Sequence, residues 1–380
     1  MDFELNADQK MLQEMIRKFA KAEIEPMAAE IDREAKFPKG NIKKLGKLGL
    51  MGVVVPEMYG GAGFDFFSLA IVVEELSKVC PSTGVIVAVH NALICYSIYN
   101  FGTEEQKKKW LPSLCKGDKI GAIGITEPNA GSDVAGMEST AVLDGDNYIL
   151  NGTKRFITNA GEASIFIIFA YTNKELKHKG ISAFVVERDT PGFTIGKHED
   201  LMGMRGTSNS ELMFENVKIP KTNILGKEGD GFKICMHLLD VSRIDIGAQA
   251  LGVAEGAFDT AIKYAKERKV FEKPIAEFQL IQAMITEMAT QIEAARWLVY
   301  YAAYCKDSGI PKFSRYSAMA KFFASETAVN VSRKALQIHG GYGYTKDYPI
   351  ERFYRDAKIL EIYEGTSEIQ KLVIARDILK

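Results

Sequence analysis

The hydrophobic pattern of this chain changes period twice, and this change constrains the fold more than any other feature. Helix-type spacing in the first third gives way to short β-rich runs with turn residues between them, and then returns and persists to the C-terminus. A chain of 380 residues is long enough for two or three domains. We therefore expect an α+β multidomain fold: an N-terminal α-helical domain (1–120), a middle β-sandwich or barrel domain (121–228) and a C-terminal four-helix bundle (229–380).

The N-terminal part carries helix start, period and stop signals. Asn6 and Gln9 have the spacing of a capping-box variant. Four apolar residues then recur at three- and four-residue spacing: Leu12, Met15, Ile16 and Phe19. Pro26 is expected to stop this helix, and further helices are expected over residues 41–50 and 68–78.

Residues 79–103 contain no Asp, Glu, Lys or Arg. The stretch is interrupted by proline and polar residues, namely Pro81, Ser82, His90, Asn91, Ser97 and Asn100. A helix facing lipid is expected to hold a more continuous apolar run of about 20 residues. We therefore expect a buried helix and no stable membrane insertion.

The middle part alternates apolar runs with turn chemistry. The expected strands include residues 148–150, 165–169, 181–186 and 211–214. Turn signals are expected at Asn151-Gly152, at residues 144–147 and at residues 189–192. A glycine-rich connection at 226–231 then precedes four expected long helices, over residues 232–268, 275–307, 313–338 and 367–379.

Several function classes lack support. The formal net charge of -1 gives no electrostatic reason to expect nucleic acid or an anionic membrane as partner. The five cysteines lie far apart, the five histidines form no ligand pair at helical spacing, and no export signal is visible, so we expect a cytoplasmic protein without a metal site. No Walker loop or nucleophile elbow is present, and Gly341-x-Gly343 is a poor dinucleotide fingerprint.

Glu364 is a loop carboxylate with apolar neighbours, directly before a segment whose S-x-x-Q spacing marks a helix N-terminus at Ser367. Apolar surroundings would raise its basicity, and free N–H groups at a helix start could stabilise charge developing on a substrate carbonyl. Both effects favour removal of a proton next to a carbonyl group. Taken alone, however, this local pattern is more often a helix-capping or salt-bridged carboxylate.

Two other segments could contact a flat polar ligand. The loop at 125–133 offers small side chains and the hydroxyl groups of Thr126 and Ser132, although an ordinary strand-to-turn connection explains it about as well. Residues 156–159 offer the aromatic ring of Phe156 beside the hydroxyl of Thr158, but Phe156 could equally be part of the β-domain core.

Taken together, these segments resemble the acyl-CoA dehydrogenases, and most of all the short-chain, butyryl-type bacterial members. The resemblance covers the whole chain and rests on motifs in the family's order, at residues 55–63, 126–133, 156–159, 267–269, 337–341 and 362–366. Several such motifs in order are far more specific than any one of them. The resemblance implies a tetramer that holds FAD between the middle domain and the helical bundle.

The resemblance also implies roles for individual residues. Thr126 and Ser132 would lie along the flavin and the thioester, Phe156 would pack on the flavin ring, and Thr158 would bond near its N5 atom. Arg268 and Phe271 would hold the pyrophosphate and adenine end of FAD, with Gln337, Gly340 and Gly341 supplied by a neighbouring subunit. The remaining implied contacts with FAD are Ile123, Ile157, Gln279, Thr366 and Glu368.

For the reaction, the resemblance implies an acyl-CoA substrate bound by Ser132, Asp240, Arg243 and Gly365. Glu364 would take the α-proton as a hydride leaves the β-carbon for the flavin, giving a trans-2-enoyl-CoA. Electrons would then pass to an electron-transfer flavoprotein. The uncharged helix that begins near Val85 would line the acyl tunnel, although core packing explains most of its residues.

Three positions discriminate within the family or depart from it. Members whose base lies just before the bundle arginine have glutamate there, where this chain has Ser242 before Arg243, so the base is assigned to Glu364. Gly84 stands where glutaryl-type members place an arginine, which disfavours a dicarboxylyl substrate. Glu272 stands where the family usually has glycine, which puts the local turn in question.

Alternative functions stay open from the sequence. The same residues would serve an acyl-CoA oxidase or an enoyl-CoA reductase working in the reverse direction, and a flavin-holding interaction protein without turnover is a further alternative. The acyl group, whether straight, branched or alicyclic, is not readable, because a single methylene changes binding by only roughly 1–3 kcal/mol.

Overall fold

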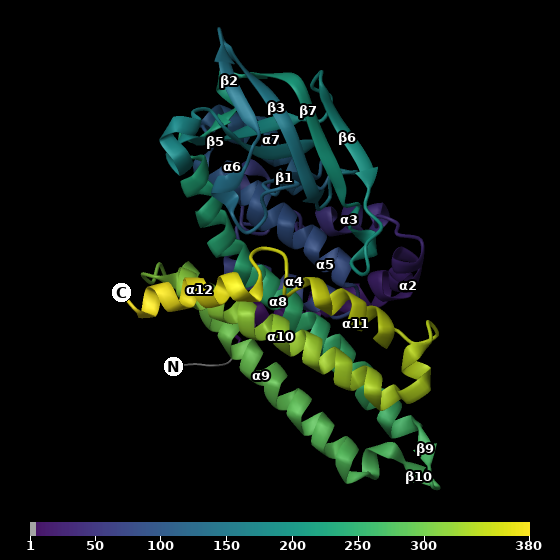
Figure 1. The fold of residues 1–380 in the computed structure, drawn as a ribbon. Helices are drawn as coiled ribbons and strands as arrows, with labels where there is room; N and C mark the ends of the chain where they lie inside the picture. Colours follow the sequence, from purple (N-terminus) through teal and green to yellow (C-terminus); the bar gives the residue numbers. More distant parts are fainter. Residues whose placement is uncertain (1–4) are drawn as a thin grey trace.

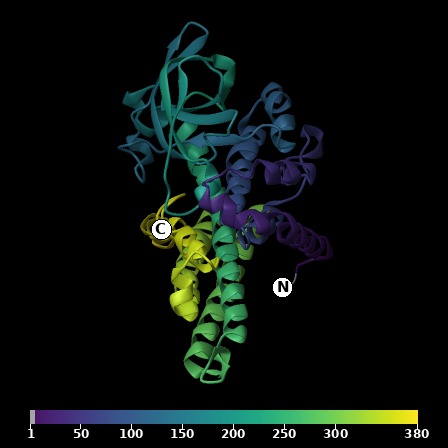
Figure 2. The ribbon, with the colours of Figure 1, turned by 90° about the vertical axis from the view of Figure 1, so that its right-hand side faces the viewer.

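A computed structural model describes residues 5–380 and shows three regions along the chain. Short helices form the first region, strands form the second, and long helices form the third (Figure 1). The β region lies at one end of the elongated molecule, and α8 runs from it into the helices at the other end (Figure 2). The expected fold class is therefore confirmed.

The N-terminal helices are α1 (Ala7–Phe19), α2 (Glu25–Arg33), α3 (Lys39–Lys47), α4 (Phe66–Ser77), α5 (Pro81–Ala88), α6 (Tyr96–Phe101) and α7 (Glu104–Cys115). Asn6 and Gln9 form the expected capping box at α1. The expected stop at Pro26 is wrong, because a wide helical turn (Ala20–Ile24) leads directly into α2. Pro26 lies in the first turn of α2, where its missing N–H leaves no hydrogen bond unmade.

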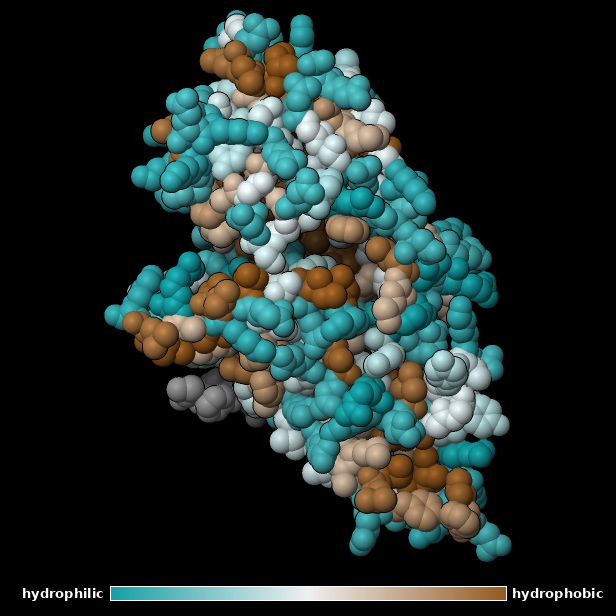
Figure 3. All heavy atoms as spheres, in the orientation of Figure 1, coloured by the Kyte–Doolittle hydropathy of each residue, from teal (hydrophilic) through white to brown (hydrophobic). Residues whose placement is uncertain are grey.

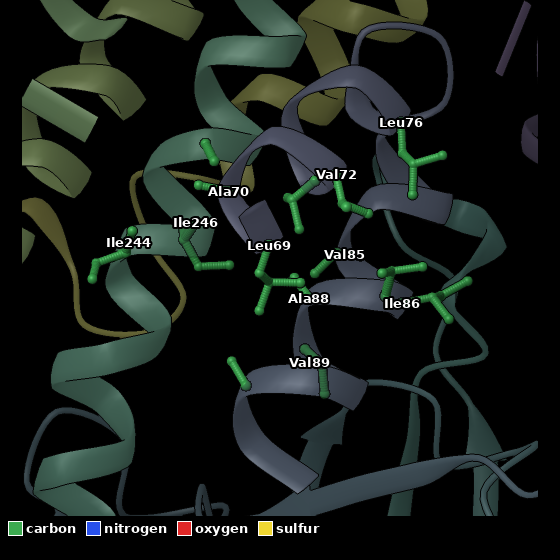
Figure 4. Close-up of a cluster of buried hydrophobic side chains, with 14 of the residues drawn as sticks. Leu69, Ala70, Val72, Leu76, Val85, Ile86, Ala88, Val89, Ile244 and Ile246 are labelled. Atoms are coloured by element: carbon green, nitrogen blue, oxygen red, sulfur yellow. The ribbon is translucent and has the colours of Figure 1, made fainter. Parts of the chain in front are cut away.

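The uncharged stretch forms a helical path from α5 through a wide turn (Val89–Cys95) to α6. By length and composition, Pro81–Phe101 could cross a membrane, but 83% of its apolar window is buried inside the protein. It packs against α4 and α8, and Figure 4 shows Ile246 of α8 pointing toward Leu69 of α4 and the residues of this path. The expectation of a buried helix is confirmed.

The middle region forms one eight-stranded sheet with the order β6-β7-β3-β2-β4-β5-β8, and β1 pairs with β4 in parallel. The strands are β1 (Gly121–Gly124), β2 (Thr140–Asp144), β3 (Asn147–Ile157), β4 (Ile165–Tyr171), β5 (Ile181–Glu187), β6 (Phe193–His198), β7 (Ser210–Pro220) and β8 (Ile224–Leu225). Phe166 of β4 packs edge-on against Phe193 of β6 with ring centres 4.8 Å apart, although these strands are not neighbours in the sheet. The sheet therefore curls around its own core.

The turn expected at Asn151-Gly152 is wrong, because β3 runs straight through these residues. A bulge in the pairing with β7 lies at this point, and Gly152 has a φ of 141° there. A Cβ on Gly152 would lie 2.2 Å from the Ser139 hydroxyl oxygen, so glycine is required for close approach rather than for a turn. The turn that joins β2 and β3 is the one expected at 144–147.

The C-terminal helices are α8 (Gly231–Glu267), α9 (Gln279–Asp307), α10 (Phe313–His339), α11 (Ile350–Ile359) and α12 (Ser367–Ile378). The first three pack side by side, and α11 and α12 pack on α10 (Figure 1). The sequence did not predict α11, and α9 begins four residues later than expected. Between α8 and α9 lies a hairpin of β9 (Lys269–Val270) and β10 (Lys273–Pro274).

Candidate active site

Glu364 lies in the loop between α11 and α12, in a strained backbone conformation. Its φ is 57° and that of Gly365 is 95°, so two successive residues are left-handed. The side chain of Thr366 caps α12 by accepting a 3.3 Å hydrogen bond from the N–H of Ile369. The expected helix start is therefore present, but its cap is one residue before Ser367.

The Glu364 side chain is half-buried against α8. The Ser242 hydroxyl donates a hydrogen bond to its carboxylate, and among residues 5–380 the carboxylate forms no ion pair within 4 Å. Burial raises the pKa of Glu364, and this rise is only partly opposed by the Ser242 hydrogen bond and the charges of Arg243 and Lys321. Glu364 is therefore neither the helix cap nor a salt-bridged group, and it has raised basicity.

At two residues of this loop, the backbone carbonyl groups form hydrogen bonds within residues 5–380 and the N–H groups do not. The carbonyl oxygens of Glu364 and Gly365 accept hydrogen bonds from side chains, whereas the N–H groups of the same two residues donate to no acceptor within the described chain. Free N–H groups at a helix start are suited to an anionic or polarised oxygen. The loop thus combines a basic carboxylate with unused donors.

The α8 residues around Ser242 bring further charges to this loop. Arg243 is buried, its Nη1 donates a 2.6 Å bond to Asp240 Oδ1, and burial lowers its pKa. Asp245 lies one helical turn from Ser242, is fully buried, and neither of its carboxylate oxygens has a hydrogen-bond partner in the described chain. Burial, together with the charge of Glu364, raises the pKa of Asp245 well above its usual range.

The loop after β1 is anchored by a buried ion pair. Lys154 Nζ lies 2.6 Å from Glu127 Oε1, and both side chains are almost completely buried. Glu127 also accepts hydrogen bonds from the N–H groups of Glu138 and Ser139, which close the loop at its other end. Thr126 is half-buried beside Glu127, and Ser132 is exposed. The segment is therefore a fixed loop with accessible hydroxyl groups.

Phe156 lies at the end of β3 with a φ of 58° and 57% of its surface exposed. The alternative that it belongs to the β-domain core is therefore wrong. Its neighbour Ile157 is buried, Thr158 is half-buried, and Ile123 is half-buried in β1. An exposed aromatic ring held by strained backbone on a rigid strand suggests a ligand-contact position rather than a packing position.

Glu368 lies in the first turn of α12, next to Thr366. The other remaining site residues from the sequence gather at the far end of the helices. A pocket of about 510 Å³ is lined there by Tyr264, Arg268, Val270, Ile275, Ile338, His339, Gly340, Gly341, Tyr342 and Thr345. Arg268 is exposed and forms no ion pair within residues 5–380. Gln279 and Gln337 are exposed nearby in the fold, at the start of α9 and the end of α10.

The departure at Glu272 has a visible consequence. Phe271 and Glu272 form the two-residue turn of the β9–β10 hairpin, with φ values of 51° and 67°. Both residues are left-handed, as in a type I′ turn, which glycine adopts without strain. Phe271 is 85% exposed at this tip. The turn is therefore formed despite Glu272, with backbone strain at that residue.

The two groups of site residues are far apart in one chain. Arg243, beside Glu364, and Arg268, in the distal pocket, are separated by 25 residues along α8 (268 − 243), which is roughly 37 Å. This separation exceeds the roughly 30 Å diameter of a small domain. The structure therefore brings Glu364, Asp240, Arg243, Gly365 and Thr366 together, but not with Arg268 or Gly340.

Sequence reasoning missed several buried polar residues around Glu364. Gln249 accepts a hydrogen bond from the Tyr363 hydroxyl, Gln370 donates to the loop carbonyls, and Lys321 donates to the Gly365 carbonyl. All three lie within helical patterns, and a polar residue on an exposed helical face gives the same local signal. Only the packing reveals that they face the loop.

Comparison with known proteins identifies the family of this chain. Three family models match: acyl-CoA dehydrogenase N-terminal domain over residues 6–118, middle domain over 122–217, and C-terminal domain over 229–379. A short-chain specific acyl-CoA dehydrogenase of Clostridium acetobutylicum is 53% identical over 380 residues, which is all of both chains. An acryloyl-CoA reductase (NADH) of Anaerotignum propionicum is 52% identical over all of this chain and 96% of its own.

Solved structures are similarly close. Butyryl-CoA dehydrogenase from Megasphaera elsdenii superposes with a TM-score of 0.98 at 45% identity, with full coverage of both chains. A chain in a structure of the electron transferring flavoprotein of Acidaminococcus fermentans gives a TM-score of 0.98 at 49% identity, also with full coverage. The fold is that of a class of oxidoreductases acting on acyl thioesters. The chain belongs to the acyl-CoA dehydrogenase family.

Proposed function

We propose that this chain catalyses FAD-dependent α,β-dehydrogenation of a short-chain acyl-CoA to the trans-2-enoyl-CoA, with Glu364 as the base. The observation that carries the proposal is the Glu364 loop: a carboxylate of raised basicity, held by Ser242 and without an ion pair, next to unused backbone N–H groups. The 53% identity to a short-chain specific enzyme over the full chain supports the substrate class.

In this proposal the chain's own residues position and deprotonate the thioester. The Glu364 carboxylate accepts the α-proton, and the free N–H of Glu364 donates a hydrogen bond to the thioester oxygen, where negative charge develops. Arg243 and Asp240 contact the CoA part, together with Ser132 and Gly365. The buried apolar helix α5 excludes water from the acyl group, which strengthens these interactions.

The residues present suit FAD. Phe156 offers an exposed ring for stacking, Thr126 and Thr158 offer hydroxyl groups, and the unpaired Arg268 suits a pyrophosphate. A Cβ on Gly340 or Gly341 would meet no atom within 4 Å, so their backbone is open to a ligand. When bound, FAD supplies the acceptor for the hydride that leaves the β-carbon. Ile123, Ile157, Phe271, Gln279, Gln337 and Glu368 complete the proposed FAD contacts.

We also propose that the protein is a homotetramer. Arg243, proposed to contact CoA, and Arg268, proposed for the adenine end of FAD, lie roughly 37 Å apart along α8. This separation supports a site in which the Arg268 pocket serves the FAD of a neighbouring subunit. Apolar surface is exposed at the far end of the bundle, including Phe271 and Leu280 (Figure 3). Exposed apolar patches of this kind commonly mark subunit interfaces.

We further propose that reduced FAD passes its electrons to an electron-transfer flavoprotein and that the protein is cytoplasmic. The similar chain in the Acidaminococcus fermentans flavoprotein structure supports this partner. The five cysteines are all buried and free, which suits a reducing compartment.

A second candidate is the reverse reaction, reduction of an enoyl-CoA. It is favoured by the acryloyl-CoA reductase that is 52% identical to this chain. The same residues would serve, since Glu364 in its protonated form would deliver the proton to the α-carbon.

The decisive experiment uses the purified FAD-loaded protein under anaerobic conditions. Addition of butyryl-CoA should bleach the flavin absorbance, and Glu364→Gln should keep its FAD but bleach about 10²–10⁴-fold more slowly, because an amide cannot accept the proton. Glu361→Gln removes an acid of the same loop region that pairs with Lys358, and it should bleach normally. Near wild-type bleaching by Glu364→Gln would contradict the assignment of the base.

A second measurement separates the two directions. Reduced protein is mixed with acryloyl-CoA or crotonyl-CoA, and reoxidation of the flavin is followed. Rapid bleaching by butyryl-CoA with slow reoxidation by the enoyl-CoA supports the dehydrogenase, and the opposite ratio supports the reductase.

A further inference from the structure

Lys321 of α10 is a buried cation directly under the Glu364 loop. None of its surface is exposed, and its Nζ donates a 2.7 Å hydrogen bond to the carbonyl oxygen of Gly365. Within residues 5–380 no carboxylate lies within 4 Å of this ammonium group. Burying a charge without a paired charge costs free energy, so its presence calls for a reason other than stability.

The loop carbonyls are held from three helices. Arg243 of α8 approaches the Glu364 carbonyl oxygen at 3.5 Å, and Gln370 of α12 donates to the same oxygen at 3.2 Å. Gln370 also donates to the Gly365 oxygen at 2.8 Å, where it meets Lys321. Because a peptide unit is planar, fixing these carbonyls also fixes the N–H groups of the following residues. The contacts therefore fix the two peptide units that follow Glu364 and Gly365.

The turn needs such contacts, because a left-handed backbone costs a residue other than glycine about 1–2 kcal/mol. Glu364 is in that conformation at a φ of 57°. A neutral donor such as Gln370 is sufficient to bond a carbonyl. The positive charge of Lys321 is thus not needed for this hydrogen bond, and it also acts on the Glu364 carboxylate, where it opposes the rise in pKa that burial causes.

We propose that Lys321 is a positioning residue for Glu364: its ammonium group fixes the left-handed turn through the Gly365 carbonyl, and its charge stabilises the ionised form of Glu364 that accepts a proton. This inference rests on the proposed function of Glu364 as base and adds to it the group that keeps the base ready.

The electrostatics of the cluster agree with this assignment. Burial lowers the pKa of Lys321 to about 8, and the charge of Glu364 opposes this. Reciprocally, Lys321 opposes the rise that burial causes in the pKa of Glu364. The other charged or titratable groups that act on this pair are Arg243, Asp245 and Cys235 from α8, Glu361 and Tyr363 from the loop, and Glu368 from α12.

Three substitutions of Lys321 separate the hydrogen bond from the charge. Lys321→Met removes both, Lys321→Gln keeps a donor without charge, and Lys321→Arg keeps the charge. Lys334→Met is the matched control, since Lys334 lies on the same helix and pairs with Glu287 away from the loop. The FAD-loaded full-length protein is assayed with butyryl-CoA and an artificial electron acceptor, with kcat, KM and the pH profile of kcat/KM as readouts.

We expect Lys321→Met to lower kcat about 10- to 100-fold, as misplacement of a reacting group by about 1 Å does, with a smaller change in KM. The acid limb of kcat/KM should move to higher pH in both Lys321→Met and Lys321→Gln, and should stay in place in Lys321→Arg and Lys334→Met. A purely structural role for Lys321 would not move this limb.

An unmoved acid limb in Lys321→Gln would overturn the proposal, and so would a wild-type kcat in a folded Lys321→Met. Should Lys321→Met not fold, Lys321→Gln still decides the effect of the charge. Failure of the proposed function is distinguishable, because then the wild-type protein itself would not be bleached by any acyl-CoA.

Discussion

Two lysines are completely buried in the described part of the chain, residues 5–380, and their surroundings differ. Lys154 in the β domain meets Glu127 at 2.6 Å, so its charge is compensated by a buried carboxylate. Lys321 in the helical region has a backbone carbonyl as its hydrogen-bond acceptor and no carboxylate within 4 Å in the described chain. Burial lowers the pKa of both lysines. For Lys154 this effect is opposed by the directly bonded Glu127 carboxylate. For Lys321, whose pKa falls to about 8, it is opposed only by carboxylates farther away, mainly Glu364.

The difference separates two uses of a buried charge. The Lys154–Glu127 pair ties both ends of the loop at 125–139 to β3, so removing one member leaves the other buried and uncompensated. Lys321 has no such partner among residues 5–380, so replacing it leaves no buried carboxylate without a counter-charge. We infer that the paired lysine stabilises the fold, whereas the unpaired one acts on the Glu364 loop.

The largest expected effect on stability comes from breaking the Lys154–Glu127 ion pair. Lys154→Met should lower the free energy of unfolding by about 3–5 kcal/mol, because it leaves the Glu127 carboxylate buried without a counter-charge. The measurement is chemical or thermal unfolding of the FAD-loaded protein at pH 7. A loss below about 1 kcal/mol would show that the charges are not coupled as the structure indicates.

The matched control is a double-mutant cycle with Glu127→Gln. The double variant Glu127→Gln/Lys154→Met should lose less stability than the sum of the single variants, since neither residue then leaves a lone charge behind. If the losses of the two single variants simply add up in the double variant, Lys154 and Glu127 are not coupled, and the contrast with Lys321 does not hold.

Asp245 extends the comparison to an unpaired acid. Its pKa is raised by burial, so the folded protein keeps a proton that the unfolded chain has released above about pH 4. This contribution to stability is complete below the unfolded pKa and is lost as pH rises toward the folded pKa. Asp245→Asn should therefore gain stability over wild type by about 1.4 kcal/mol per pH unit as the pH rises from the unfolded pKa of about 4 toward the raised folded pKa.

The measurement is the difference in unfolding free energy between Asp245→Asn and wild type as a function of pH. Taking this difference cancels other groups, including Asp356, whose pKa burial raises to about 7. A difference that does not depend on pH would mean that Asp245 is ionised in the folded protein.

Ser242 allows the effect of a neutral hydrogen-bond donor on the Glu364 carboxylate to be measured. Its hydrogen bond opposes the rise in the pKa of Glu364, so Ser242→Ala should move the acid limb of kcat/KM to higher pH. The loss corresponds to about 1 kcal/mol, or a few-fold in kcat/KM at pH 7. Ser325→Ala, which removes a hydroxyl bonded within α10, serves as control. An acid limb that moves to lower pH would contradict this geometry.

The smallest expected effect completes the comparison. Lys321→Met should change the free energy of unfolding by less than about 1 kcal/mol, or raise it, because an unpaired buried ammonium is replaced by an apolar chain of similar length. The same unfolding assay applies as for Lys154→Met. A loss of stability as large as that of Lys154→Met would mean that Lys321 stabilises the fold, as Lys154 does.

Local sequence signals predicted most helices and strands, and failed where the same residue type is compatible with two different local structures. The capping box at Asn6 and the buried uncharged helix are read correctly, since both depend on nearby residues. Pro26 and Gly152 were misread, because proline fits a first helical turn as well as a stop, and glycine fits a bulge as well as a turn. The short helix α11 was missed between longer, clearer patterns.

The sequence by itself determined the order of the three regions and the segments that carry the family motifs, which follow from residue identity and spacing along the chain. The choice of Glu364 over the position of Ser242 as the proposed base came from the family resemblance. The tertiary structure decided what surrounds Glu364: the left-handed turn, the carbonyl contacts from three helices, and the unpaired Lys321 and Asp245. Such features depend on which side chains meet across distant segments, and burial alone changes a lysine from a solvated surface group into a charge that acts on its neighbour.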